Sequence, residues 1–166
     1  EEQETLAGYQ IATRGYFETL GIPLRKGRLP TWADGPEDPH AVVVNEALVR
    51  RFFPDGDVLG RRVTWGDPEA DDGGWSTIVG VVGNALQGGL DREPRPELFR
   101  LYAQAPLPFM TLVARSETEA GPLAALLREA VSEVDPRVPL YGMAAMEELV
   151  AESLGRRRFA MILLAA

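Results

Sequence analysis

The chain has 166 residues, of which 45% are hydrophobic and 25% charged, and this composition fits one globular domain or two small subdomains. A formal net charge of −8 repels phosphate backbones and anionic lipid headgroups, so we expect no nucleic-acid partner. The absence of cysteine excludes disulfides, thiolate metal sites and thiol nucleophiles.

The first 104 residues are rich in predicted strands. Gly21 can end a short helix in a left-handed conformation, and Asn45 can cap the helix that follows the apolar run AVVVN. The turn-rich stretch at 27–39 predicts a loop. In chain order we expect a strand at 9–13, helical turns at 14–21, a strand at 41–45, a helix at 46–53, and strands at 61–65, 75–83 and 97–102.

The last third changes character. A strand is predicted at 109–116, and apolar residues then recur at helical spacing. These apolar residues are Leu123, Leu126, Leu127, Ala130, Val131 and Val134. A further strand at 137–141 completes a βαβ-like unit, and a second helix is expected at 144–154. The sequence therefore predicts a β-rich middle part and an α/β part.

Three sequence features are candidates for a calcium site, a phosphate-binding loop and a general base. Asp67, Glu69 and Asp71 alternate as at the start of a calcium loop, but Ile78 stands where a bidentate Glu is needed, so we expect a solvated loop. The glycines in GVVGNALQGG lack phosphate-loop spacing and the following Lys-Ser/Thr, which favours a strand end leading into a loop. His40 could act as a general base, but no G-x-S-x-G motif accompanies it, and an exposed loop histidine is expected.

These readings leave no catalytic residue, no cofactor-binding residue and no metal ligand to predict, and we do not expect an enzyme. Pairs of carboxylates could support glycoside hydrolysis only at a spacing in space that the sequence does not supply.

The C-terminal stretch FAMILLAA has no polar side, so water all round would be a poor environment for it. Eight residues are too short to span about 30 Å of hydrocarbon. We therefore expect residues 156–166 to be the start of a truncated transmembrane helix, with Arg156, Arg157, Arg158 and Phe159 at the juxtamembrane level. The alternative is a buried C-terminal helix in a free-standing soluble ligand-binding protein or enzyme.

Several segments, taken in order, resemble the extracytoplasmic domain, or MacB-like periplasmic core, of ABC transporter permeases of the FtsX/MacB type. The ordered set is more specific than any one segment. The segments are RGYFETLGIPLRKGR, VVVNEALVRRFFPDGDVLGRRV, TIVGVVGN, GLDREPRPELFRLYAQ, FMTLVARS, and LREAVSEVDPRVPLYGMAAMEELVAESLGRRRFAMILLAA.

The resemblance implies an α+β fold: a porter-like βαβ unit, ferredoxin-like and here incomplete, with a β-rich sabre-like insertion. Residues 1–27 and 105–155 would form the porter-like subdomain, and residues 28–104 the insertion. Family members carry a further strand and helix upstream of the segment that corresponds to Tyr9, so a sheet edge or a helix face is expected to lack its usual cover.

The resemblance also implies a role. The domain would be non-catalytic, would lie on the extracytoplasmic (periplasmic) side of the cell membrane, and would transmit conformational change while contacting partner or cargo during export. ATP hydrolysis would belong to a separate cytoplasmic ABC ATPase subunit or domain, reached through the membrane part. A second permease copy or half is a further implied partner, and an extracytoplasmic adaptor could bind the loops near Pro36 or Gly88.

Overall fold

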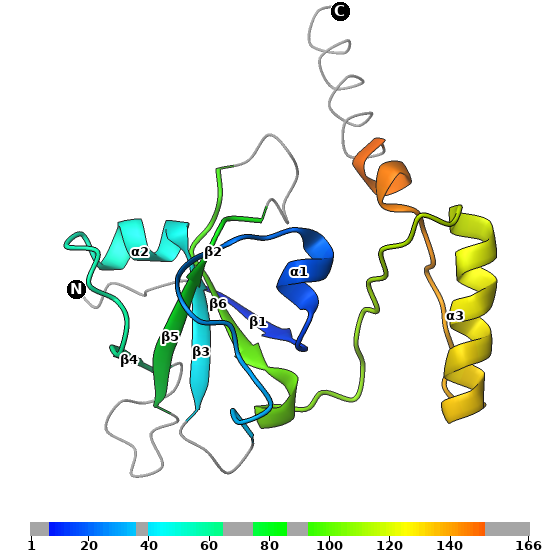
Figure 1. Cartoon of the computed structure of the whole chain (residues 1–166), viewed down its shortest axis with the longest axis horizontal. Helices are drawn as coiled ribbons and strands as arrows, with labels where there is room; N and C mark the ends of the chain where they lie inside the picture. Colours follow the sequence, from blue (N-terminus) through cyan, green and yellow to red (C-terminus); the bar gives the residue numbers. More distant parts are fainter. Residues whose placement is uncertain (1–6, 36–39, 65–74, 86–92, 152–166) are drawn as a thin grey trace, which may run out of the picture. The chain divides into compact units, whose positions relative to one another are not determined.

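A computed structural model describes residues 7–35, 40–64, 75–85 and 93–151 (Figure 1). The contacts divide the chain into two compact units. The first unit comprises residues 1–85 and 93–113, and the second comprises residues 86–92 and 114–166.

The first unit is built on one mixed sheet whose strand order is β1-β6-β3-β5-β2, with β4 paired to β5. Two pairs, β1 with β6 and β3 with β5, are parallel, and the others are antiparallel. The elements are β1 (Gly8–Ala12), α1 (Tyr16–Leu20), β2 (Leu24–Gly27), β3 (Ala41–Asn45), α2 (Glu46–Phe52), β4 (Arg62–Val63), β5 (Ser76–Val82), β6 (Glu97–Leu101) and the 3-10 turn η1 (Tyr102–Gln104).

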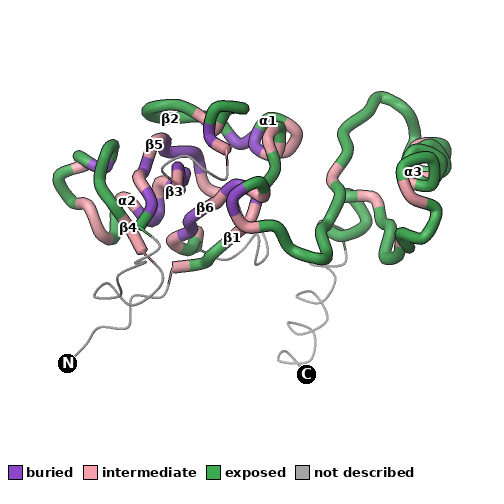
Figure 2. Tube along the Cα trace, turned by 90° about the horizontal axis from the view of Figure 1, so that it is seen from below, coloured by how far each residue is buried: buried purple, intermediate pink, exposed green. Residues whose placement is uncertain are grey.

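Strand β3 lies at the centre of the sheet, as its uninterrupted apolar sequence predicts, and all five of its residues are buried (Figure 2). Its side chains alternate between two hydrophobic clusters. Val42 and Val44 pack with Leu48 of α2, whereas Val43 packs with Phe17 of α1. The two short helices thus cover opposite faces of the sheet, and burial of both faces holds the unit together.

Both predicted helix boundaries are confirmed by their backbone chemistry. Gly21 ends α1 with φ 68°, in the left-handed region that a glycine adopts without steric cost. The Asn45 side chain accepts a hydrogen bond from the Leu48 N–H at 2.9 Å and so caps α2. Helix α2 ends at Phe52, one residue before the expected end, and Phe53 is its C-cap.

Strand β5 contains a register shift where it pairs with β3. Val42 pairs with Ile78, but Val43 pairs with Gly80. The extra residue lets Ile78 and Val81, three positions apart, face the same hydrophobic cluster. Gly80 is required at this place, because a Cβ atom there would lie 2.2 Å from the Arg28 carbonyl oxygen.

The observed grouping of the chain differs from the predicted subdomains. The segment at residues 1–27 was expected to join residues 105–155, yet β1 pairs with β6 and β2 pairs with β5 of the middle region. These pairings join segments that are far apart in the sequence, which local patterning does not reveal. Strand β6 has four of its five residues buried because it lies between β1 and β3.

The second unit contains the predicted amphipathic helix, α3 (Ala120–Val134), and residues 146–151 are also helical. No residue of α3 is buried. The strands expected at 109–116 and 137–141 are not formed, because no strand among the described residues pairs with these segments. The predicted helix beyond residue 151 and the stretch at 156–166 lie outside the described residues.

Candidate functional site

An internally braced loop follows β2 in the first unit. The Arg28 guanidinium donates two hydrogen bonds of 2.7 Å to the two carboxylate oxygens of Asp34. The same carboxylate accepts the Thr31 N–H at 2.6 Å and the Thr31 hydroxyl at 3.1 Å. The sequence predicted a loop here, and the structure shows that a bidentate ion pair fixes its conformation.

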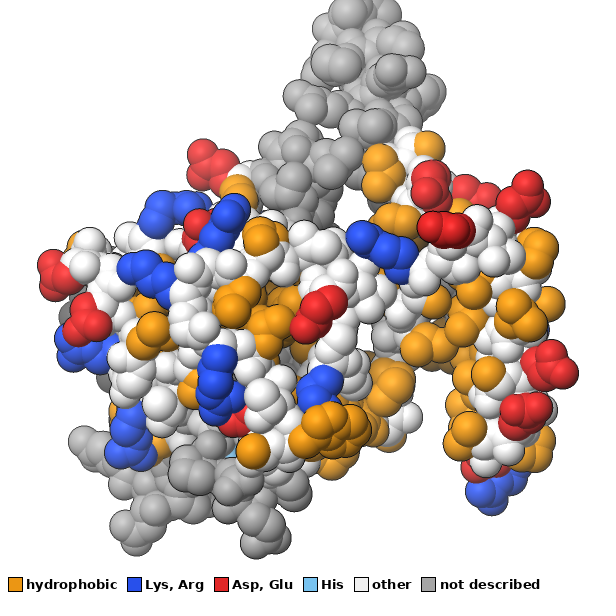
Figure 3. Space-filling view, viewed as in Figure 1, with side chains coloured by type: hydrophobic (Ala, Val, Ile, Leu, Met, Phe, Trp, Pro, Cys, Tyr) orange, Lys and Arg blue, Asp and Glu red, His pale blue; other side chains and the backbone are white. Residues whose placement is uncertain are grey.

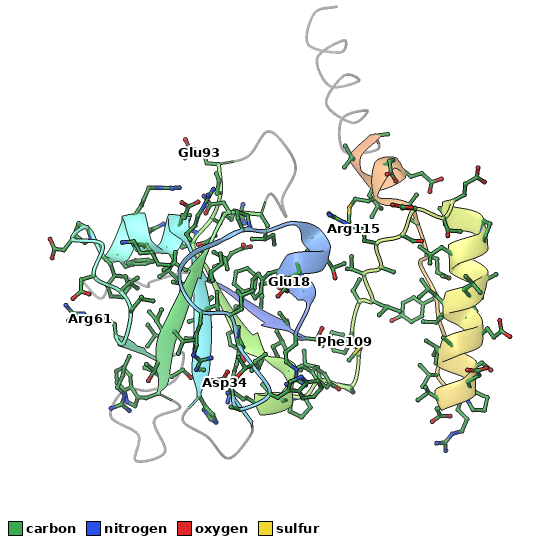
Figure 4. The ribbon with its side chains drawn as sticks, in the orientation of Figure 1. Glu18, Asp34, Arg61, Glu93, Phe109 and Arg115 are labelled. Atoms are coloured by element: carbon green, nitrogen blue, oxygen red, sulfur yellow. The ribbon has the colours of Figure 1, made fainter. Side chains whose placement is uncertain are left out.

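Asp34 is buried, with 5% of its surface exposed, although it carries a charge. Hydrogen bonds from Arg28 and Thr31 stabilise its ionised form and lower its pKa from 3.8 to about 2. Gln104 of η1 donates to the Asp34 carbonyl at 3.4 Å and so links the loop to the end of β6. Figure 4 labels Asp34 at the lower end of the sheet.

The braced loop presents an aromatic ring to solvent. Trp32 is 83% exposed, and the Arg14 guanidinium carbon lies 3.2 Å from the centre of its ring. This is a cation–π contact between the loop and the segment that joins β1 to α1. Tryptophan and arginine dominate the energetics of many protein interfaces, so the Trp32–Arg14 pair is the most distinctive candidate contact point of the first unit.

A small hollow lies next to the braced loop and the start of α1, with Thr13, Gly15, Glu18, Leu29 and Pro30 among the residues that line it. Its volume is about 20 Å³. This is room for about one water molecule, whereas ligand pockets measure about 300 to 1,000 Å³. The hollow is therefore too small for an organic ligand or a cofactor.

His40 lies half-buried beside a cation. The Arg100 Nη2 atom is 3.1 Å from Nδ1 and 3.4 Å from Nε2 of the imidazole. Burial lowers the pKa of His40, and the positive charge of Arg100 lowers it further. The ring was expected to be an exposed loop histidine, and the structure instead places it against β6, where it favours the neutral form.

The described glycines of the predicted glycine-rich loop serve close packing. Gly80 meets the Arg28 carbonyl, as described above, and a Cβ atom at Gly83 would lie 3.0 Å from the ring of Pro23. The acidic stretch with Asp67, Glu69 and Asp71 lies outside the described residues. Among the residues that the structure does describe, no group of three or more His, Cys, Asp or Glu side chains is arranged to hold a metal ion.

Large hydrophobic side chains are exposed along the last third of the described chain. Figure 3 shows such side chains on the surface of α3, interspersed with acidic ones. Leu126 is 56% exposed and Val134 is 88% exposed, and Phe109, labelled in Figure 4, is 70% exposed. Periodicity predicted the apolar face of α3 but not its exposure.

The predicted juxtamembrane residues Arg156, Arg157, Arg158 and Phe159 lie outside the described residues, so their placement stays a prediction. Within residues 7–151, leaving out the undescribed stretches, no helix combines the length and the apolar character needed to cross a bilayer.

Comparisons with known proteins give the chain its family. The family model of the MacB-like periplasmic core domain matches residues 1–136. The chain is similar to the periplasmic region of MacB from Actinobacillus actinomycetemcomitans, with 18% identity and a TM-score of 0.52 over 74% of this chain and 54% of that one. It is also similar to the extracellular domain of the noncanonic ABC-type transporter YknZ from Gram-positive bacteria, with 17% identity and a TM-score of 0.47 over 72% of this chain and 62% of that one.

No curated protein matches the chain. The chain spans 54% of the length of the MacB periplasmic region. The likeness to MacB is one of fold, and it confirms the α+β class that the sequence predicted, here with a mixed sheet. Because the family model extends over most of the sequence, the chain belongs to the family of MacB-like periplasmic core domains, the extracytoplasmic domains of MacB/FtsX-type ABC transporter permeases.

Proposed function

We propose that this domain is a non-catalytic, extracytoplasmic module of an ABC transporter permease, which transmits conformational change between the membrane part and a partner or cargo. The match of the MacB-like periplasmic core over residues 1–136 carries the proposal.

The packing of the first unit suits it to move as a rigid body. Both faces of its sheet are covered, and the side chains of Val42, Val43 and Ile78 are fully buried. Closely packed interiors deform little, so a force applied at one edge displaces the whole unit. The bidentate Arg28–Asp34 pair extends this rigidity to the loop that presents Trp32.

The proposed partners follow from the transporter role. A cytoplasmic ABC ATPase would supply the energy through the membrane part, and a second permease copy or half would complete the transporter. The exposed Trp32 ring, held against the Arg14 guanidinium, offers a contact for an extracytoplasmic adaptor. Residues 156–166 would begin a transmembrane helix, with Arg156, Arg157, Arg158 and Phe159 at headgroup level.

Labelling of single cysteines in intact cells tests the location. The chain has no cysteine, so Glu93→Cys in the full-length permease introduces one exposed thiol in the first unit. We expect a membrane-impermeant maleimide to label it before the cells are opened. Leu48→Cys is the matched control, because Leu48 is only 4% exposed and should react only after unfolding. Labelling of Glu93→Cys that requires permeabilised cells would contradict the proposal.

A further inference from the structure

Glu97, the first residue of β6, is a carboxylic acid enclosed by the fold. It is 6% exposed. A Cβ atom on Gly8 of β1, its pairing partner, would lie 3.4 Å from the Glu97 Cγ atom and 4.0 Å from its Oε1 atom. The carboxyl group therefore lies over the first residue of β1, where the absence of a side chain leaves room for it.

The backbone of Glu97 is well bonded, but its side chain is not. The Glu97 N–H donates to the side-chain oxygen of Asn45 at 3.0 Å, and Asn45 itself is fully buried. In contrast, the buried Oε2 atom has no hydrogen-bond partner among the residues that the structure describes. An ionised carboxylate in this position loses hydration without gaining a compensating bond, which disfavours the charged form.

The shifted pKa values of two side chains agree with this geometry. Burial raises the pKa of Glu97 above its ordinary value of 4.5. The pKa of Tyr16 in α1 is also raised, first by its own burial and then by the negative charge of Glu97. Tyr16 therefore lies within electrostatic reach of the carboxylate, on the helix that covers this face of the sheet.

The charged groups of the surrounding elements do not neutralise Glu97. Glu46, at the start of α2, faces Arg25 of β2 at 3.5 Å. Lys26 of β2 donates to the Gly56 carbonyl at 3.3 Å, and Arg95, two residues before Glu97, is exposed. Strand β1 contributes Tyr9 as its one titratable side chain. Among the described residues, no ion pair involves Glu97.

We propose that Glu97 is a proton-binding site of the first unit, and that proton uptake in mildly acidic medium tightens the packing of β6 against β1 and α1. Release of the proton leaves a buried anion whose Oε2 lacks a partner, and this weakens the same junction. The proposal does not depend on the transport role, because its test is the stability of the domain itself.

Urea unfolding at a series of pH values tests the proposal. The three tryptophans, Trp32, Trp65 and Trp75, all belong to the first unit, so their fluorescence reports the unfolding of that unit. An acid whose folded pKa is raised contributes stability that is complete below its unfolded pKa and is lost as the pH rises through its folded pKa. We therefore compare the urea midpoint of the wild-type chain with that of Glu97→Gln, which keeps the shape and removes the charge.

We expect the two midpoints to coincide near pH 4 and the Glu97→Gln midpoint to be the higher one at pH 8. Taking the difference between variant and wild type at each pH cancels the contribution of His40, which is present in both. Glu18→Gln is the matched control for removal of one negative charge, because Glu18 is an exposed glutamate on α1. A constant difference for Glu97→Gln, or a lower midpoint at pH 8, would overturn the proposal.

A direct titration keeps the proposal testable if the variant does not fold. The carbon-13 shift of the Glu97 carboxyl group in the wild-type chain should show half-protonation above its ordinary pKa of 4.5. Half-protonation of Glu97 at or below its ordinary value of 4.5 would refute the proton site.

Discussion

Replacement of Asp34 by asparagine tests how strongly the braced loop is held. The substitution keeps the side-chain shape but removes the charge that accepts two 2.7 Å hydrogen bonds from Arg28. A pKa lowered from 3.8 to about 2 corresponds to about 2 kcal/mol, at about 1.36 kcal/mol per pKa unit. The Arg28 side chain is 50% exposed, and solvent screens its part of the interaction, so we expect Asp34→Asn to cost about 1 to 2 kcal/mol.

The assay is urea unfolding followed by tryptophan fluorescence. Because the pKa of Asp34 is lowered in the folded state, its contribution to the free energy of unfolding is complete above pH 3.8 and is lost as the pH falls toward 2. The wild-type chain should lose this contribution in that window, and Asp34→Asn should not. Asp57→Asn is the matched control, since the Arg61–Asp57 pair is wider, at 3.7 Å, and largely exposed, and should contribute under about 0.5 kcal/mol. Equal costs for the two variants would refute the reasoning.

Three further substitutions probe the first unit. The pKa of His40 is lowered, so its contribution to the free energy of unfolding is complete above pH 6.5 and is lost as the pH falls below that value. His40→Gln should remove this pH dependence from unfolding curves recorded between pH 7.5 and 5. Gly80→Ala forces a Cβ atom to within 2.2 Å of a carbonyl oxygen and should abolish the cooperative unfolding transition, whereas Gly121→Ala in α3 meets nothing within 4 Å and should leave the circular dichroism intact. Asn45→Ala removes hydrogen bonds to the Arg95 carbonyl and from the Leu48 and Glu97 N–H groups, and should cost about 3 kcal/mol in urea unfolding; a cost below about 1 kcal/mol would show that these bonds are replaced by others.

Features set by short-range chemistry were predictable from the sequence. The apolar run at 41–45 predicted a strand, Asn45 predicted a helix cap, and Gly21 predicted a helix end. Each depends on residues at most a few positions apart. The periodicity of α3 was likewise sufficient to place a helix, although not to say what its apolar face contacts.

Features set by long-range pairing were not predictable. The parallel pairing of Gly8–Ala12 with Glu97–Leu101 decides which unit the first residues belong to, and nothing in either segment encodes its partner. The segment at 109–116 has strand propensity, but propensity forms a strand only where a neighbouring strand supplies hydrogen bonds.

The braced loop and the proposed proton site at Glu97 likewise depend on long-range pairing that the sequence alone does not reveal. Arg28 and Asp34 lie in the stretch that the sequence predicts as a loop. Their bidentate hydrogen bonding depends on the fold around them and could not be predicted from that stretch alone. The sequence predicts a strand that begins at Glu97, but the burial of Glu97 follows from the placement of β6 inside the sheet. The spacing of Thr31 and Asp34, three residues apart after a proline, was the one local signal of an ordered turn.

Distance measurements between spin labels in the full-length transporter test the central claim, that the first unit of the domain moves as a rigid body when motion is transmitted. One pair of labels, at Arg61 and Glu93, lies within the first unit, and a second pair, at Glu93 and Glu129, joins the two units. With the cytoplasmic ATPase trapped in its nucleotide-bound state, we expect the first distance to stay unchanged and the second to shift. An unchanged distance between the units, or a changed distance within the first unit, would contradict the account.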